Sequence, residues 1–385
     1  MSAKRKDSKG RVLKAGEYQK SSGSYEYRWV DGQQKSHSIY RKTLDELRKA
    51  EADVQRDLSD GIDYSAGEMT VAELVDRYME IKSCKLKENS LRAYGSAVNT
   101  IKESSFGSKK IRNIKKSDAQ MWFMQLHKQG LARNTIGVIK TVIQPAFELA
   151  VDDDAIRKNP FRFNISDLLA DDAVYRDALT EAQQRKYLQF IKDYGNDNYY
   201  DDIVILVETG LRISELYGLT TSDVDLVKRR VHVRRQLCRT GDDPYFITTP
   251  KSNSGVRTVP LSDSAYEAFR HALSHRAKPQ VEMMIDGVSG FIFLDKDGRP
   301  KVAMHCQNYM RNMQKKYRKL CGGHMPTVTP HVLRHTFCTR MAQRELDPKS
   351  LQYVMGHSKP DITLNVYTHA DYDYVEHAFR KALNG

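Results

Sequence analysis

Two histidines and an arginine stand close together in the stretch TPHVLRHTF. Thr329 fits the N-cap of a helix, and Pro330 fits its first turn because the N–H that proline lacks would have no partner there. His331, Arg334 and His335 then share one helix face beside the positive end of the helix dipole. That face is suited to an anion. A surface turn with a histidine packed in the core explains the isolated stretch equally well, so the rest of the chain has to decide.

Four further groups suited to anion binding, proton transfer or nucleophilic attack stand elsewhere in the C-terminal half: Arg212 in TGLRISEL, Lys251 in TPKSNSG, His357 in MGHS and Tyr367 in VYTH. Each has an ordinary explanation by itself. These are a surface arginine paired with Glu215, a solvated lysine, a loop histidine and a half-buried packing tyrosine. Together they supply what cleavage of a phosphodiester without a metal ion requires.

The chemistry follows from the charge that develops on phosphorus. Nucleophilic attack places negative charge on the two non-bridging oxygens, and two arginines can hold these oxygens in fixed geometry in place of a metal ion. A tyrosine hydroxyl is a competent nucleophile when cations favour its phenolate, and the aryl phosphodiester that it forms conserves the energy of the broken bond. A lysine can protonate the departing sugar 5′-oxygen, and histidines can accept or donate a proton. Such a site needs no cofactor, metal ion or ATP.

Composition favours a nucleic-acid partner. The 385 residues include 62 Lys and Arg against 49 Asp and Glu, a formal net charge of +13. This excess indicates an anionic partner, with nucleic acid ahead of a membrane surface, although a solvated basic surface without a partner is the simpler alternative. The length predicts two or three domains.

The cysteines and the apolar pattern indicate where the protein works. Five scattered cysteines form no C-x-x-C pair, which argues against a disulfide framework or a zinc ribbon and for a reducing cytoplasm. No apolar run approaches the length of a membrane span, and no apolar segment follows the basic N-terminus as in a signal peptide. We therefore expect a cytoplasmic protein with no membrane partner.

The first unit predicted along the chain is a small sheet with one helix. Aromatic side chains alternate in YEYRWVDG, at Tyr25, Tyr27 and Trp29. They either contact DNA or simply bury one face of the sheet. The following Asp31-Gly32 predicts a hairpin turn, and Thr43 with Glu46 predicts a capped helix that ends near Gly61.

The next stretch has helical patterns throughout. Thr70 with Glu73 and Ser117 with Gln120 mark helix starts, and Pro145 is expected to kink or divide a later helix. We predict a bundle of four or five helices with basic side chains near their starts. Nothing in this bundle is catalytic by itself.

The third unit mixes helices and strands. Thr180 with Gln183 opens a helix, and Gly210 separates two more. RRVHVRRQL, YFITTP and VRTVPL read as short strands, with KSNSG as a hairpin tip between the last two. Helices are expected to resume at Asp263, after Lys301, at Thr329 and near Asp371.

The ordered motifs TGLRISEL, TPKSNSG, HVLRHTF, MGHS and VYTH resemble those of the tyrosine recombinases, or phage integrase family. KRKDSKGRVLKAGEYQ, IRKNPF and TPHVLRHTFCT extend the resemblance to integrases of conjugative transposons over nearly the whole chain. The resemblance implies a small α+β arm-type DNA-binding domain at 1–64. An all-α core-binding bundle at 65–165 and a mixed α/β, mainly helical catalytic domain with a C-terminal tail at 175–385 would follow.

The resemblance also implies roles for the residues already singled out. Arg212 and Arg334 would clamp the phosphate, Lys251 would be the general acid, and Tyr367 the nucleophile. His331 would be a general base or a hydrogen-bond donor to the phosphate, and His357 would be a second hydrogen-bond donor. Glu215 would support the structure of the site. No residue is expected to bind a metal ion. His335 is not a catalytic position in the family, and its apolar neighbours suggest packing.

The implied function is site-specific recombination of a mobile element. The enzyme would cut and rejoin double-stranded DNA through a 3′-phosphotyrosyl intermediate, binding core and arm sites. It would act as a homotetramer on DNA with an accessory excisionase or DNA-bending protein, and it would be nucleoid-associated when on DNA. The segment YVEHAFRKAL is compatible with a tail that docks on a neighbouring protomer.

Three alternatives remain open from the sequence. A DNA-binding regulator without catalysis would use the same basic surface but would not explain the motifs around His357 and Tyr367. A topoisomerase-like enzyme would nick and close DNA by the same chemistry without strand exchange. A hydrolytic zinc site at His331 and His335 lacks the glutamate of H-E-x-x-H, since Val332 stands there.

Overall fold

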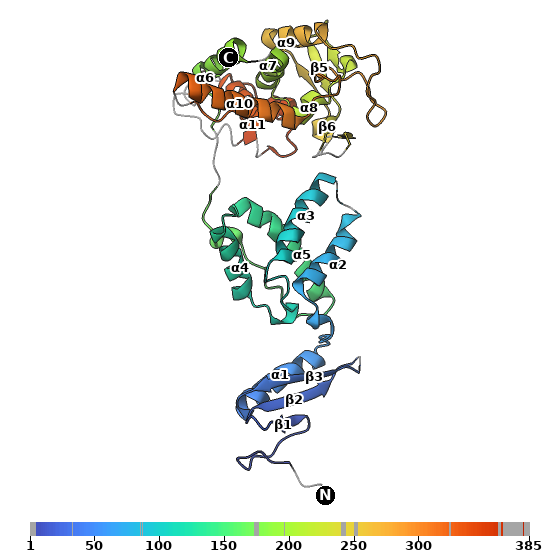
Figure 1. Ribbon diagram of the computed structural model, residues 1–385, viewed down its shortest axis with the longest axis vertical. Coiled ribbons are helices and arrows are strands. Elements are labelled where there is room, and N and C mark those ends of the chain that lie inside the picture. The colour runs from blue at the N-terminus through green and yellow to red at the C-terminus, as the bar shows by residue number, and fades with distance from the viewer. Residues whose placement is uncertain are drawn as a thin grey trace. The chain divides into compact units, whose positions relative to one another are not determined.

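The computed structural model describes residues 5–32, 34–84, 86, 88–172, 177–195, 197–239, 244–249, 253–322, 325–360, 363–364 and 380. The chain forms two compact units, Met1–Val174 and Tyr175–Gly385 (Figure 1). Lys251, Tyr367 and the helix predicted near Asp371 lie outside the described residues.

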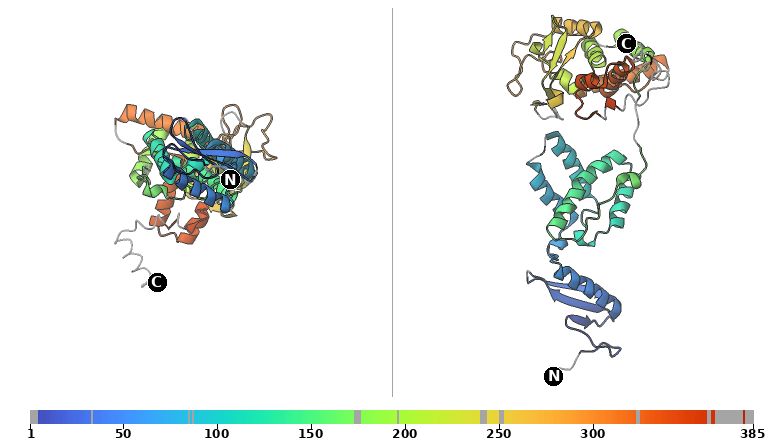
Figure 2. Two further views of the ribbon diagram at one scale, coloured as in Figure 1. Left: turned by 90° about the horizontal axis from the view of Figure 1, so that it is seen from below. Right: turned by 180° about the vertical axis from the view of Figure 1, so that it is seen from behind.

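The chain begins with an antiparallel sheet covered by one helix. The strands β1 (Glu17–Gln19), β2 (Tyr25–Val30) and β3 (Ser36–Arg41) pair in that order, and α1 (Leu44–Ser59) packs against β2 and β3. Figure 2 shows the same sheet and helix from behind. The three alternating aromatic residues of β2 are at most 8% exposed and pack with Leu44 and Leu47. They therefore form the core of this part, which agrees with the second of the two alternatives, the burial of one face of the sheet.

Four α-helices follow within the described residues of the first unit: α2 (Val71–Ser83), α3 (Glu88–Glu103), α4 (Lys116–Lys128) and α5 (Arg133–Asp152). The start predicted at Thr70 is confirmed, because its hydroxyl accepts the Glu73 N–H while the Glu73 carboxylate accepts the Thr70 N–H. Pro145 lies inside α5, which continues past it as one helix.

The helix start predicted at Ser117 is displaced. α4 begins one residue earlier, at Lys116, and the Asp118 carboxylate accepts the Lys115 N–H at 2.9 Å. The capping group is therefore an aspartate in the first turn. Ser117 and Gln120 form no capping box, because both lie inside the helix.

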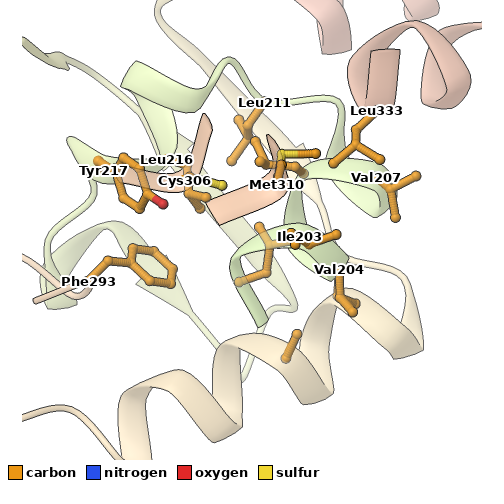
Figure 3. Packing of buried hydrophobic residues seen from close by; sticks show 14 of the residues in the cluster. Ile203, Val204, Val207, Leu211, Leu216, Tyr217, Phe293, Cys306, Met310 and Leu333 are labelled. Atoms are coloured by element: carbon orange, nitrogen blue, oxygen red, sulfur yellow. The ribbon is translucent and has the colours of Figure 1, made fainter. Parts of the chain in front are cut away.

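The second unit is mainly helical. Its α-helices are α6 (Glu181–Tyr194), α7 (Tyr200–Thr209), α8 (Ile213–Tyr217), α9 (Asp263–Ser274), α10 (Ala303–Cys321), α11 (Pro330–Gln343) and α12 (Pro348–Met355). α7 packs against both α9 and α11. Figure 3 shows Val207 of α7, Leu216 of α8, Met310 of α10 and Leu333 of α11 within one core. The predicted helix starts at Thr180 and Thr329 and the break at Gly210 are confirmed.

Short strands lie at one side of this helical core. β4 (Val224–Asp225), β5 (Arg230–Val233) and β8 (Arg257–Pro260) form one sheet, and β6 (Gln236–Cys238) pairs with β7 (Phe246–Thr248). Since β7 and β8 pair with different strands, the KSNSG segment joins two described sheets. The prediction that it closes a hairpin between β7 and β8 is wrong.

Six short 3-10 helices connect the longer described elements: η1 (Ala66–Glu68), η2 (Ile111–Asn113), η3 (Ile165–Asp167), η4 (Asp197–Tyr199), η5 (Thr221–Asp223) and η6 (Asn253–Gly255). Among the helices that the structure describes, none combines the length and the apolarity needed to cross a lipid bilayer.

Candidate active site

Arg212 is oriented by a local capping interaction. Gly210 ends α7 in the left-handed conformation, with φ of 65°, and Arg212 then takes the N-cap of α8. Glu215 accepts the Arg212 backbone N–H through Oε2 at 2.9 Å and the Arg212 Nη1–H through Oε1 at 2.7 Å. Because both bonds go to one carboxylate, the arginine side chain is held over the start of its own helix. It remains 32% exposed.

Arg334 joins two segments that are distant in the sequence. It lies on α11 and is 6% exposed. Its Nη1 donates to the Gly210 carbonyl at 2.5 Å, and its Nη2 donates to the Met355 carbonyl. A guanidinium has five N–H donors, so these two bonds leave capacity for a bound anion. Burial, and then the charge of Arg212, lower the pKa of Arg334 to about 9, and the side chain therefore stays charged at neutral pH.

His357 is held beside the same arginines by the turn after α12. Gly356 ends that helix with φ of 63°, and its carbonyl accepts from Arg212 Nη2 at 3.2 Å. The imidazole is buried, with Nδ1 at 2.8 Å from the Thr363 hydroxyl. Burial lowers the pKa of His357 to about 4, and the charges of Arg334 and Arg212 add to the effect. The ring is therefore neutral at pH 7 and can donate a hydrogen bond from one nitrogen.

A third arginine completes the cluster, and the sequence interpretation missed it. Arg257 lies on β8 with a fully buried side chain, and it donates to both carboxylate oxygens of Glu215, at 3.2 and 2.9 Å. Burial acts to raise the pKa of Glu215, but the hydrogen bonds and charge of Arg257, followed by the charges of Arg212 and Arg334, hold it at about 2. The available sequence signal was an arginine in the mainly apolar segment VRTVPL.

His331 and His335, the two histidines of TPHVLRHTF, lie in the first turns of α11. The Thr329 hydroxyl accepts the Val332 N–H, which confirms the predicted cap. His331 is exposed and borders a surface cavity of about 310 Å³. His335 is also exposed, so the prediction that it packs in the core is wrong. No cluster of three or more His, Cys, Asp or Glu residues that could hold a metal ion occurs within the described ranges.

The fold therefore brings together Arg212, Glu215, Arg334 and His357, with Arg257 added. Arg212 and Arg257 both bond to the Glu215 carboxylate, and the charge of Arg334 also lowers the pKa of Glu215, at the meeting point of α8, β8, α11 and the turn after α12. A partly buried cluster with this excess of positive charge is suited to binding an anion such as a phosphodiester.

The buried neutral state of His357 predicts a pH effect on stability. The imidazole takes up its proton near pH 6.5 when unfolded and only near pH 4 when folded. Between these values the unfolded state binds more protons, so the free energy of unfolding is expected to fall as the pH drops from 6.5 to 4.5. His357→Gln should flatten this slope in thermal denaturation across that range. An identical slope in wild type and His357→Gln would contradict the interpretation.

Comparison with known proteins places the chain in a family. Residues 177–373 match the phage integrase family, and residues 1–58 match the DNA-binding domain of the Tn916 integrase. Residues 70–127 match the N-terminal SAM-like domain of phage integrases. The chain belongs to the phage integrase family, whose members are the tyrosine recombinases.

The similarity to conjugative-transposon proteins covers nearly the whole chain. It is 39% identical to the transposase from transposon Tn1545 of Streptococcus agalactiae, over 97% of this chain and 95% of that protein. The identity and both coverages are the same for the transposase from transposon Tn916 of Enterococcus faecalis. A solved Tn1549 transposon integrase in complex with transposon right end DNA is 39% identical, with a TM-score of 0.76 over 82% of this chain and 100% of that chain.

These findings confirm the resemblance and the predicted fold class. The chain is a tyrosine-type site-specific recombinase of the transposon integrase kind, and it acts on DNA. The alternative of a DNA-binding regulator without catalysis is wrong.

Proposed function

We propose that the arginine cluster holds the phosphate at which the DNA strand is cut. The observation that carries this proposal is the charge balance of the cluster: it contains three guanidinium groups and only one carboxylate, and Arg212 is partly open to solvent. Arg212 and Arg334 clamp the two non-bridging oxygens, and Glu215 supports Arg212. Neutral His357 donates a hydrogen bond to a phosphate oxygen.

The covalent step uses groups on both sides of that phosphate. The Tyr367 hydroxyl loses its proton to a base, and its oxygen forms a bond to phosphorus. His331 is either that base or a hydrogen-bond donor to a phosphate oxygen. The bond from phosphorus to the sugar 5′-oxygen breaks, and Lys251 protonates the departing oxygen. The product is a 3′-phosphotyrosyl linkage and a free 5′-hydroxyl. The reverse reaction with another 5′-hydroxyl rejoins the DNA, so no metal ion or ATP is consumed.

The three predicted parts of the chain would divide the work. Residues 1–64 bind arm-type sites, residues 65–165 bind the core site, and residues 175–385 catalyse. Solved relatives contain transposon right end DNA and circular intermediate DNA, which supports the ends of a mobile element as the substrate here. Exchange of two duplexes needs four strand cuts, so we propose a homotetramer on DNA, assisted by an excisionase or a DNA-bending protein in the bacterial cytoplasm.

The decisive experiment tests cleavage in the presence of a chelator. A suicide DNA substrate, nicked so that the cut end diffuses away, is expected to trap a covalent protein–DNA adduct in excess EDTA. The reason is that arginines supply the charge stabilisation that a metal ion would otherwise give. The adduct is measured as a band that survives denaturing electrophoresis and disappears with protease.

Two outcomes of this experiment would change the proposal. Loss of the adduct on chelation, with recovery on adding Mg²⁺, would contradict the metal-free mechanism. Adduct formation without any exchanged product from two intact duplexes would instead favour the topoisomerase-like activity.

A further inference from the structure

Arg257 occupies a place in the cluster that the catalytic roles above do not use. Its side chain is fully buried and cannot reach a bound DNA strand without rearrangement. Both of its η nitrogens donate to Glu215, the same carboxylate that orients Arg212. The question is what this second arginine on one carboxylate does.

The charges in the cluster suggest an answer. A carboxylate paired with one arginine forms a neutral unit, and such a unit attracts a phosphate weakly. Glu215 is needed to orient Arg212, because it accepts both the backbone N–H and the side-chain Nη1–H of that residue. The negative charge of Glu215 would therefore offset the positive charge of Arg212 and weaken its attraction for the phosphate, unless a further cation compensated the carboxylate.

The contacts of Arg257 fit that compensating task. It takes both carboxylate oxygens in the bidentate geometry that is strongest for guanidinium and carboxylate. Its Nε donates to the Val354 carbonyl at 2.6 Å, which fixes the arginine to the end of α12. The fit around it is close, since a Cβ added at Gly356 would lie 2.9 Å from Arg257 Nη1.

We propose that Arg257 is a positioning residue that offsets the charge of Glu215, so that Glu215 can orient Arg212 while Arg212 keeps its net positive charge for the phosphate. The inference rests on the proposed function of the cluster. A purely structural role, in which Arg257 only ties β8 to α8 and α12, is the competing explanation. The two differ in what happens when Glu215 is neutralised.

The test compares Arg257→Met, Glu215→Gln and the double variant with the wild type. The measured quantities are the single-turnover rate of adduct formation at saturating suicide substrate and, separately, DNA affinity. Arg257→Met is expected to lower the rate by at least about tenfold, because an uncompensated carboxylate then faces the phosphate. Adding Glu215→Gln should recover at least about threefold of that loss, since it removes the uncompensated charge. DNA affinity should change little, because it depends on many phosphate contacts.

A purely structural role predicts the opposite for the double variant. If Arg257 only ties elements together, the double variant should form the adduct as slowly as Arg257→Met or more slowly. That result would overturn the proposal. If Arg257→Met does not fold, the comparison of Glu215→Gln with the double variant replaces it. The proposal then predicts a further loss of less than about threefold, because Arg257 has no charge left to offset once Glu215 is neutralised. A larger loss would overturn it.

Two controls separate the possible causes of a negative result. Lys301→Met uncovers Asp202, another buried carboxylate of the same unit, and is expected to lower thermal stability without lowering the single-turnover rate of the folded protein. A drop in rate there equal to that of Arg257→Met would show that any uncovered buried carboxylate has this effect, and would overturn the specific role. Wild-type protein that forms no adduct would contradict the proposed function itself, whereas a wild-type adduct without charge rescue would contradict only the role of Arg257.

Discussion

Replacing Tyr367 by phenylalanine is expected to abolish the covalent adduct with a suicide substrate while leaving DNA binding intact. The phenyl ring keeps nearly the size of the side chain but lacks the oxygen that attacks phosphorus, so the covalent bond cannot form at this position. Loss of a nucleophile lowers the rate by at least about 10³-fold in enzymes of this kind of covalent chemistry. The measurement is the yield of adduct on denaturing gels, with DNA affinity determined in parallel.

Neighbouring tyrosines provide matched controls for this prediction. Tyr372 and Tyr374 stand within seven residues of Tyr367, and each can be changed to phenylalanine in the same way. Both single variants should still form the adduct. An adduct that persists in Tyr367→Phe and disappears in either control would assign the nucleophile to that neighbour.

Arg212→Gln is expected to lower the single-turnover rate of adduct formation by about 10² to 10³-fold, the effect typical of removing one preorganised charge-stabilising donor. The variant loses the charge and the forked donor that Glu215 and the Gly356 carbonyl hold in place. Because Arg212 is 32% exposed, folding should be affected less than catalysis. DNA affinity should fall only modestly, since many phosphate contacts contribute to it.

A surface arginine of the same unit serves as the control for Arg212. Arg229 pairs with Asp263 at 2.5 Å, and its side chain is 53% exposed. Arg229→Gln should leave the rate of adduct formation nearly unchanged, because exposed ion pairs contribute little. Equal losses in the two variants would mean that net charge, and not the position of Arg212, governs cleavage. Arg212→Lys should fall between wild type and Arg212→Gln, because lysine keeps the charge but not the fork.

Much of the local structure followed from the sequence, because helix capping involves residues only three or four positions apart. The starts at Thr70, Thr180 and Thr329 lie where the hydroxyl and its partner predict them. The start at Ser117 failed since a nearby aspartate, Asp118, offered the competing cap at Lys115. The prediction that His335 packs in the core is wrong for a different reason: apolar neighbours along the chain do not decide which face of a helix is covered.

Strand pairing is a second feature that the sequence pattern does not predict. The β-branched residues of RRVHVRRQL, YFITTP and VRTVPL predict strands, but the order of strands in a sheet depends on pairing between distant segments. β5 pairs with β8 and β6 with β7, so the strands nearest in sequence to KSNSG do not pair with each other. No pattern within a single strand contains that information.

The sequence by itself indicated the class of enzyme and the residues of the proposed site, because the motifs around Arg212, Arg334 and His357 stand in the order typical of the family. Only the tertiary structure decided how the charges balance. Arg257 reaches Glu215 from 42 positions away, and Arg334 reaches the Gly210 carbonyl from 124 positions away. Burial at that meeting point lowers the pKa of His357 and of Arg334, and desolvation of this kind arises only when distant segments pack together.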